Sequence, residues 1–249
     1  MVIGTKVNNT IYDLQTTQEL GLEGEPIYFD NSQDSLAIVR HTCAHLMAEA
    51  IKSLYPEAQF FVGPVVEEGF YYDFRVKQKI SEEDLERIES KMKEIANKGE
   101  QITKYHLPRE EIIEKFKSDD LKQAVISRIP LGDGTLSVYS QGDFEDLCRG
   151  PHLPNLKLLK AFKLTKVAGA YLGGDEKAEM LTRIYGIAFA DKESLHQYLR
   201  QLEEAKKRDH RKIGVEMELF TFDEEVGAGL PIWLPKGARL RRNLENLLT

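Results

Sequence analysis

The chain has 249 residues, enough for one large domain or two smaller ones, and its 41% hydrophobic and 30% charged residues are typical of a folded globular protein. A net charge of −7 excludes a general electrostatic attraction to nucleic acid, so any RNA contact must come from local basic patches. No apolar run reaches the roughly 18 residues of a membrane helix, and two cysteines argue against a disulfide framework and predict a reducing, cytoplasmic environment.

The first segment, residues 1–35, is weakly patterned. Val2-Ile3 and Thr10-Ile11-Tyr12 could form short strands, and residues 21–26 have the composition of a loop. The pattern indicates no function for this segment.

A helix is predicted next, from Asp34 or Ser35, either of which can cap it, to just before Pro56. Its apolar residues recur with a period of 3.6. His41 and His45 are four residues apart, so they lie on one face of this helix and can point at one place. A single histidine on such a helix is more often satisfied in the core, but the shared face of two favours a functional site.

The following residues predict a fold rich in antiparallel strands. Alternating apolar residues at 59–66 and 70–74 indicate a hairpin that Gly63-Pro64 interrupts, and Tyr71 and Tyr72 should face opposite sides of it. We therefore predict an α+β fold, an antiparallel sheet with helices packed on it. The further expected elements are a helix that starts with a capping box at Ser81 and ends at Gly99, strands at 102–107, 136–139, 162–172 and 183–190, a helix at 110–117, and a short turn or helix at 121–126.

A second cluster of functional side chains lies at 146–152, Asp-Leu-Cys-Arg-Gly-Pro-His. Cys148 and His152 are also four residues apart, but Pro151 disfavours a helix, so we expect a loop that presents both side chains to His41 and His45. Three imidazoles and one thiolate could hold zinc tetrahedrally. Equally, an imidazole could take a proton from water in a metal-free hydrolysis. The spacing leaves both chemistries open.

The character of the chain changes after residue 190. A long charged helix is predicted at 191–212, and its basic residues either face solvent or contact RNA phosphates. A loop at 227–235 and the start of another helix follow. We expect the last roughly 35 residues to open a further domain, because so short a piece rarely buries a core of its own.

Several motifs together resemble those of bacterial threonyl-tRNA synthetases. They are Arg-His-Thr-Cys-Ala-His at 40–45, Gly63-Pro64 with Gly-Phe-Tyr-Tyr-Asp at 69–73, the cluster at 146–152 and Arg-Asp-His-Arg-Lys at 208–212. The resemblance implies an editing domain at 36–190, a linker helix at 191–212 and the truncated start of a class II catalytic domain at 213–249. Residues 1–35 would then be an incomplete or absent ubiquitin-like domain.

The resemblance also implies an editing site that hydrolyses mischarged seryl-tRNA(Thr). Serine lacks one methyl group of threonine, and a missing methyl gives only about 1–3 kcal/mol of discrimination, so a second site must remove the error. We expect His41, with His152, to activate water, Lys122 to neutralise charge or hold a ribose hydroxyl, and Asp146 to bind the seryl ammonium. Cys148 and the Gly150-Pro151 backbone would form the steric wall. The implied catalytic residues are His41, His45, Cys148, His152 and Lys122, and the implied substrate-binding residues are Asp146, Tyr72 and Gly63.

The family implies further properties of the whole enzyme. It attaches threonine to tRNA(Thr) with ATP, magnesium and zinc, as a cytoplasmic homodimer without membrane association. The ATP motifs and zinc ligands are expected beyond Thr249, so this chain should lack the aminoacylation site. The editing site is expected to use no cofactor and to take the seryl-charged 3′ end of tRNA(Thr) as its partner.

Two other functions compete with this reading. One is a free-standing, zinc-dependent aminoacyl-tRNA deacylase of the alanyl type, since related histidine and cysteine motifs hold zinc in alanyl editing domains. The other is a non-catalytic tRNA-docking module that uses the charged helix and the basic residues Lys157, Lys160, Lys163 and Lys166. Metal content and the loss or survival of hydrolysis separate these three functions.

Overall fold

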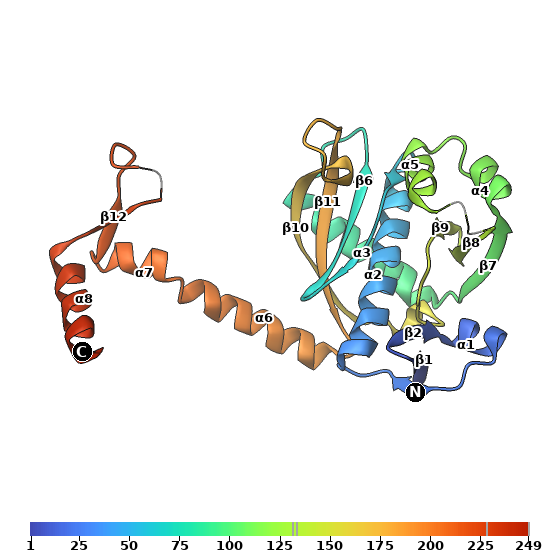
Figure 1. Ribbon diagram of the computed structural model, residues 1–249, viewed down its shortest axis with the longest axis horizontal. Coiled ribbons are helices and arrows are strands. Elements are labelled where there is room, and N and C mark those ends of the chain that lie inside the picture. The colour runs from blue at the N-terminus through green and yellow to red at the C-terminus, as the bar shows by residue number, and fades with distance from the viewer. Residues whose placement is uncertain (131, 133, 228, 249) are drawn as a thin grey trace. The chain divides into compact units, whose positions relative to one another are not determined.

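The computed structural model describes residues 1–249 except 131, 133, 228 and 249, and the chain divides into two compact units, Met1–Leu195 and His196–Thr249. The first unit is built on an antiparallel sheet of order β10-β11-β6-β4, with β5 also paired to β6 (Figure 1). Strands β4 and β5 both pair with β6, and Gly63-Pro64 lies between them in the chain. The predicted interrupted hairpin is therefore confirmed. These strands are β4 Gln59–Phe60, β5 Val65–Val66, β6 Gly69–Arg75, β10 Ala161–Tyr171 and β11 Met180–Phe189.

Two long helices, α2 Gln33–Leu54 and α3 Leu85–Lys98, pack against this sheet and against each other (Figure 1). Their buried faces form one core with the sheet, so the α+β prediction is confirmed. The capping box at Ser81 is present, and Gly99 ends α3 with a φ of 71°, as its sequence predicts. Helix α2 begins slightly earlier than predicted, after Ser32, and the hydroxyl of Ser35 instead accepts a hydrogen bond from the backbone of Asp30.

A second antiparallel sheet has the order β7-β8-β9 and is covered by two short helices. Strand β9 was not predicted, because it is only four residues long and its charged residues were assigned to the loop of the site. Asp146 therefore lies in a strand, directly across from Tyr139 of β8. The elements are β7 Ile102–Pro108, α4 Arg109–Lys115, α5 Asp120–Arg128, β8 Thr135–Gln141 and β9 Phe144–Leu147. The first unit also contains three short 3₁₀ turns, Glu82–Asp84, Leu156–Leu158 and Leu172–Gly174.

The N-terminal residues form a small sheet of order β2-β1-β3, which belongs to the first unit. Ile3 and Ile27 are buried and join the core around α2. Residues 1–35 therefore pack on the same core as the predicted editing domain. The elements are β1 Val2–Val7, β2 Thr10–Asp13, α1 Leu14–Leu20 and β3 Glu25–Tyr28.

The charged helix predicted at 191–212 is two helices, α6 Lys192–Lys207 and α7 His210–Glu216. The second is capped by Asp209, whose carboxylate accepts from the backbone of Arg211. The chain continues with strand β12 Phe220–Phe222, strand β13 Pro231–Trp233 and helix α8 Pro235–Leu248. Residue 228 of the expected loop at 227–235 and residue 249 of the expected catalytic-domain start at 213–249 lie outside the described residues. Among the helices that the structure describes, none is long and apolar enough to cross a membrane.

Candidate active site

The first part of the site is on α2. His41 and His45 lie one turn apart on the same face of this helix, and the centroids of their rings are 5.3 Å apart. His45 is buried, whereas His41 keeps part of its surface exposed. The helix thus presents two imidazoles to one place, with His41 nearer to solvent.

The second part is the loop that follows β9. Gly150 has a φ of +76°, and a Cβ at this position would run into the hydroxyl group of Tyr139, so the loop requires glycine here. The loop is fixed to α2 because the Leu153 N–H donates to the hydroxyl of Thr42 at 2.9 Å. This contact brings the ring of His152 to 4.3 Å from that of His41 and 4.2 Å from that of His45, centroid to centroid.

Cys148 contacts two of the three imidazoles. Its Sγ is 3.2 Å from Nε2 of His41 and 3.4 Å from Nε2 of His152, and it accepts from the Gly150 N–H at 3.2 Å. Burial raises the pKa of the Cys148 thiol to about 12, although the Gly150 N–H acts in the opposite direction. At neutral pH Cys148 is therefore a thiol, which is a weak nucleophile.

All three imidazoles are neutral at pH 7. Burial lowers the pKa of His41 to about 4, while the charge of Asp146 and a hydrogen bond to the Pro151 backbone act against it. Burial lowers the pKa of His45 to about 3 and that of His152 well below its usual range. Neutral imidazoles can accept a proton, as a general base must, and can also bind a metal ion.

A buried ionic group supports the histidines from behind. Lys122 forms an ion pair with Asp146, whose second oxygen accepts a hydrogen bond from the hydroxyl of Tyr72. That oxygen also lies 3.7 Å from Nε2 of His45. Burial alone would raise the pKa of Asp146, but the Lys122 ammonium outweighs it and the pKa is lowered, so the carboxylate stays charged. Gly63 belongs here because a Cβ at its position would run into the ring of Tyr72.

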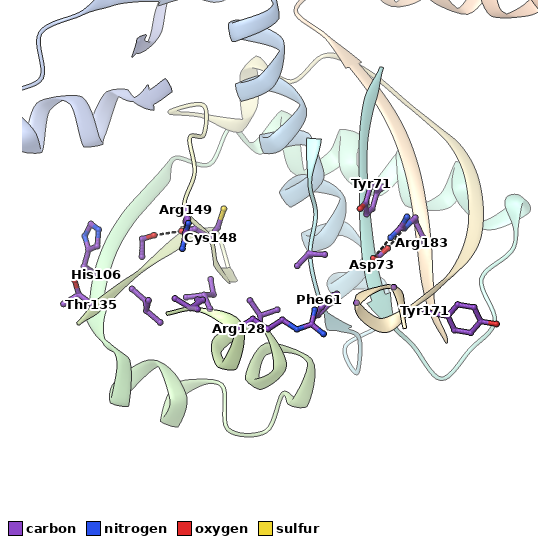
Figure 2. A pocket seen from close by; sticks show the side chains of 18 residues that line it. Phe61, Tyr71, Asp73, His106, Arg128, Thr135, Cys148, Arg149, Tyr171 and Arg183 are labelled. Atoms are coloured by element: carbon purple, nitrogen blue, oxygen red, sulfur yellow. Dashed lines mark hydrogen bonds and ion pairs between the residues drawn. The ribbon is translucent and has the colours of Figure 1, made fainter. Parts of the chain in front are cut away.

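A cleft of about 720 Å³ leads to this cluster (Figure 2). Cys148 lines this cleft. Of the eight catalytic and substrate-binding residues that the resemblance implies, it is the one that lies in the lining among the described residues. The structure therefore brings the histidines, Cys148, Lys122, Asp146 and Tyr72 into one contiguous group, with Gly63 against Tyr72, but most of the group lies behind Cys148 rather than in the open cleft.

The cleft also contains residues that sequence reasoning did not assign. Arg183 makes a two-pronged ion pair with Asp73, at 2.6 and 2.7 Å, and its guanidinium lies 3.8 Å from the centroid of the Tyr71 ring. Arg128, at the end of α5, lies 5.1 Å from the centroid of Phe61. The predicted alternation of Tyr71 and Tyr72 was a signal for this surface, since it places Tyr71 on the opposite face of β6 from the buried Tyr72.

The donor set fits a metal ion. One donor atom each from His41, His45, Cys148 and His152 lies within 4.8 Å of the others. Donor atoms around a tetrahedral zinc ion are about 3.5 Å apart, so small side-chain movements would complete the site. The geometry is thus compatible with both chemistries that the spacing left open.

Comparison with known proteins agrees with this geometry. The family "Threonyl and Alanyl tRNA synthetase second additional domain" matches residues 136–185, which hold β8, β9 and the loop of Cys148 and His152. The whole chain is 73% identical to a threonine--tRNA ligase of Helicobacter hepaticus over 248 residues and 66% identical to one of Campylobacter lari. A threonine--tRNA ligase of Sulfurovum sp. is 68% identical over 238 residues.

These matches include 96–100% of the chain but 39–41% of the relatives. The chain thus spans about two fifths of the length of the curated relatives it matches. With this identity along nearly its whole length, and with the second additional domain in place, the chain belongs to the threonyl-tRNA synthetase family.

Proposed function

We propose that the predicted domain at 36–190 is an editing domain that hydrolyses the ester of mischarged seryl-tRNA(Thr). The observation that carries this proposal is the group of three neutral imidazoles packed behind Cys148, which itself lines a cleft and contacts His41 and His152. Such imidazoles can accept a proton from water at neutral pH. The similarity to threonine--tRNA ligases supplies the substrate class.

In the proposed reaction His41 is the general base. Its Nε2 faces Cys148, which borders the cleft, and His41 is less buried than His45 or His152. A water molecule loses a proton to this nitrogen while its oxygen attacks the ester carbonyl carbon. The bond from that carbon to the ribose oxygen then breaks, and the imidazolium returns the proton to the ribose oxygen. His45 and His152 hold the position of His41 through their ring contacts.

Asp146 and Lys122 have paired roles in this proposal. The seryl ammonium needs an anionic partner, and Asp146 is an ionised carboxylate next to His45. Lys122 and Tyr72 occupy its oxygens, so binding requires the ammonium to displace the Lys122 side chain from Asp146. The displaced Lys122 would then be free to neutralise the charge that develops on the ester oxygen.

In this proposal the steric wall of Cys148 and the Gly150-Pro151 backbone excludes the threonyl ester. The Gly150 N–H fixes the sulfur, and the contact between Gly150 and Tyr139 fixes the loop. An additional methyl group would have to displace this packed wall, which costs free energy. The terminal adenosine would lie in the cleft, where Arg128 offers a positive charge and the Arg183 guanidinium, stacked on Tyr71, offers a second one.

For the whole protein we propose the activity that its relatives' names state, ligation of threonine to tRNA(Thr), with ATP and magnesium as a class II enzyme. Zinc would read threonine in that aminoacylation site, outside residues 1–249. The proposal includes a cytoplasmic homodimer. The ligase activity in this proposal is supported by the 73% and 66% identity to threonine--tRNA ligases.

Deacylation assays with seryl-tRNA(Thr) and threonyl-tRNA(Thr) test the editing proposal on this chain. We expect rapid hydrolysis of the seryl ester only, and a loss of about 10²–10⁴-fold in His41→Ala, the range of a general base. The control is His196→Ala, since His196 is an exposed histidine of α6. The proposal would be contradicted if His41→Ala were as active as the unmodified chain, or if the seryl and threonyl esters were hydrolysed equally fast.

The same assay separates the rival functions. A chelator should leave the hydrolysis of seryl-tRNA(Thr) unchanged if the site is metal-free. Abolished activity, restored by zinc and accompanied by a preference for alanyl-tRNA, would identify the alanyl-type deacylase. Salt-sensitive tRNA binding without any hydrolysis would identify the docking module.

A further inference from the structure

The N-terminal sheet reaches the back of the candidate site, although its sequence indicates no function. We propose that Asp13, at the end of β2, is a positioning residue for His152 and acts through Tyr139. This inference rests on the proposed editing function for its kinetic part. It adds a residue outside the predicted editing domain to the groups that determine the rate.

Asp13 has two partners in a buried position. One carboxylate oxygen caps α1 by accepting from the Thr16 N–H at 2.8 Å, and the other accepts from the hydroxyl group of Tyr139. Asp13 is 5% exposed and Tyr139 is 3% exposed, so water does not compete for this hydrogen bond. The bond ties the start of α1 to the middle of β8, 126 residues away.

Tyr139 carries this constraint to His152. The two rings meet edge to face, with centroids 4.5 Å apart. The hydroxyl of Tyr139 also lies where a Cβ of residue 150 would be, so the same group borders the loop that presents His152. Lys104 adds a second contact from β7, because its ammonium lies 5.6 Å from the Tyr139 centroid and donates to the hydroxyl of Thr16.

His152 depends on this packing for its orientation. Its Nε2 contacts Cys148, but its Nδ1 is buried and has no hydrogen-bond partner among the described residues. A small cavity of about 50 Å³, lined by Asp13, Tyr139 and His152 among others, lies beside the ring. The ring therefore has space to turn and no second hydrogen bond to prevent it. Tyr139, held by Asp13, is what restricts that movement.

The functional consequence follows from the ring contacts of the cluster. His152 packs on His41 and contacts Cys148, so a shift of His152 displaces the proposed base and the wall of the site. A displacement of about 1 Å in a catalytic site can cost up to about 10²-fold in rate. The cleft proposed to hold the terminal adenosine does not include Asp13 or Tyr139. Loss of the hydrogen bond should therefore lower kcat and leave KM nearly unchanged.

Two substitutions remove the Asp13–Tyr139 hydrogen bond from opposite ends. Asp13→Ser keeps an oxygen that can cap α1 but is too short to reach Tyr139, and Tyr139→Phe keeps the ring against His152. We expect each to lower kcat for seryl-tRNA(Thr) hydrolysis about 10-fold. The double variant should be no worse than Tyr139→Phe alone, which removes the bond to Asp13 and also a hydrogen bond with Thr16. Asp13→Asn should keep most of the rate, because its amide oxygen can still cap α1 while its NH2 group donates to the hydroxyl oxygen of Tyr139.

The matched control is Lys6→Ala. It removes a different contact of the N-terminal sheet, the 2.8 Å ion pair with Asp34, and should leave kcat unchanged. An independent readout is the nitrogen chemical shifts of the His152 ring in nuclear magnetic resonance spectra. They should change in Asp13→Ser and Tyr139→Phe but not in Lys6→Ala.

The outcomes separate this inference from the proposed function. Unchanged kcat and unchanged His152 shifts in both variants overturn the positioning role, as does an equal loss in Lys6→Ala. If the unmodified chain does not hydrolyse seryl-tRNA(Thr), the editing proposal fails. The His152 shifts then decide the positioning role alone, and unchanged shifts overturn it.

Discussion

Two carboxyl groups near helix α2, the buried Asp146 and the half-buried Glu49, have pKa values that are shifted in opposite directions. Asp146 faces His45 of α2 and is held as a carboxylate, because the Lys122 ammonium outweighs the effect of burial. Glu49 is one turn beyond His45 on the same helix, and burial raises its pKa to about 7. A hydrogen bond from Gln141 acts against this rise, and the nearby Glu100 carboxylate adds to it.

The comparison shows that burial alone does not determine the charge of a group in this core. Burial opposes ionisation at both carboxyl groups: at Asp146 the Lys122 ammonium overcomes it, whereas at Glu49 burial is the largest cause of the raised pKa. The Lys122 cation keeps Asp146 ionised, so the histidine cluster has an anion beside it. The neighbouring carboxyl group, Glu100, adds to the burial that favours the protonated form of Glu49.

The largest effect is expected from Lys122→Ala. This substitution leaves the Asp146 carboxylate buried without its cation, and removing one partner of a buried ion pair typically costs about 3–5 kcal/mol of unfolding free energy. Urea denaturation at pH 7 measures it. Lys91→Ala is the control, because Lys91 pairs with Glu94 at the surface and should cost at most about 1 kcal/mol. Adding Asp146→Asn to Lys122→Ala should recover part of the loss, and a loss that it does not recover would contradict the account.

Tyr72→Phe should have the next largest effect. It removes the hydroxyl that donates to Asp146 and leaves a charged oxygen with one partner fewer, at a cost of about 1–3 kcal/mol. Tyr71→Phe is the matched control on the other face of β6, and it should change stability by no more than about 0.5 kcal/mol. Equal losses in the two variants would show that the bond to Asp146 contributes nothing.

Glu49 predicts a smaller effect that depends on pH. Its pKa is about 7 in the folded chain and close to 4.5 when unfolded, so its contribution is fully present below pH 4.5 and is lost as pH rises through 7. Because Glu49 is partly exposed to solvent, we expect the loss between pH 6 and 8 to be on the order of 1 kcal/mol.

Glu49→Gln tests this contribution, because it cannot ionise and should flatten the stability profile over that range. Glu100→Gln should shift the transition to lower pH, since it removes a carboxylate that raises the pKa of Glu49. The charge of Lys98 lowers the pKa of Glu49 and is present in both variants. Thermal unfolding across pH measures both variants. A profile of Glu49→Gln that still falls between pH 6 and 8 like that of the unmodified chain would contradict the assignment.

The sequence predicted what depends on local spacing. The 3.6-residue period placed α2, and the i, i+4 spacing placed His41 and His45 on one face. Pro151 identified a loop rather than a helix around His152, and the capping box at Ser81 identified the start of α3. In each case the determining residues lie within a few positions of one another.

What the sequence did not predict depends on contacts between distant segments. Asp13 and Tyr139 are 126 residues apart, and no local pattern links them. The ion pair of Arg183 with Asp73 arises from the pairing of β11 with β6, whose register could not be derived from either strand alone. Strand β9 was missed because four residues with two charges carry too weak a pattern. For Lys122 and Asp146, only the resemblance to a family suggested a functional role.

The pH dependence of seryl-tRNA(Thr) hydrolysis, corrected for the spontaneous rate, tests the central claim that an imidazole already neutral at physiological pH activates water. With the pKa of His41 near 4, the enzymatic rate should be constant from about pH 5.5 to 8 and should fall only in more acid solution. A rate that instead rises around pH 6.5, the usual pKa of histidine, or around the pKa of a free thiol would contradict the account.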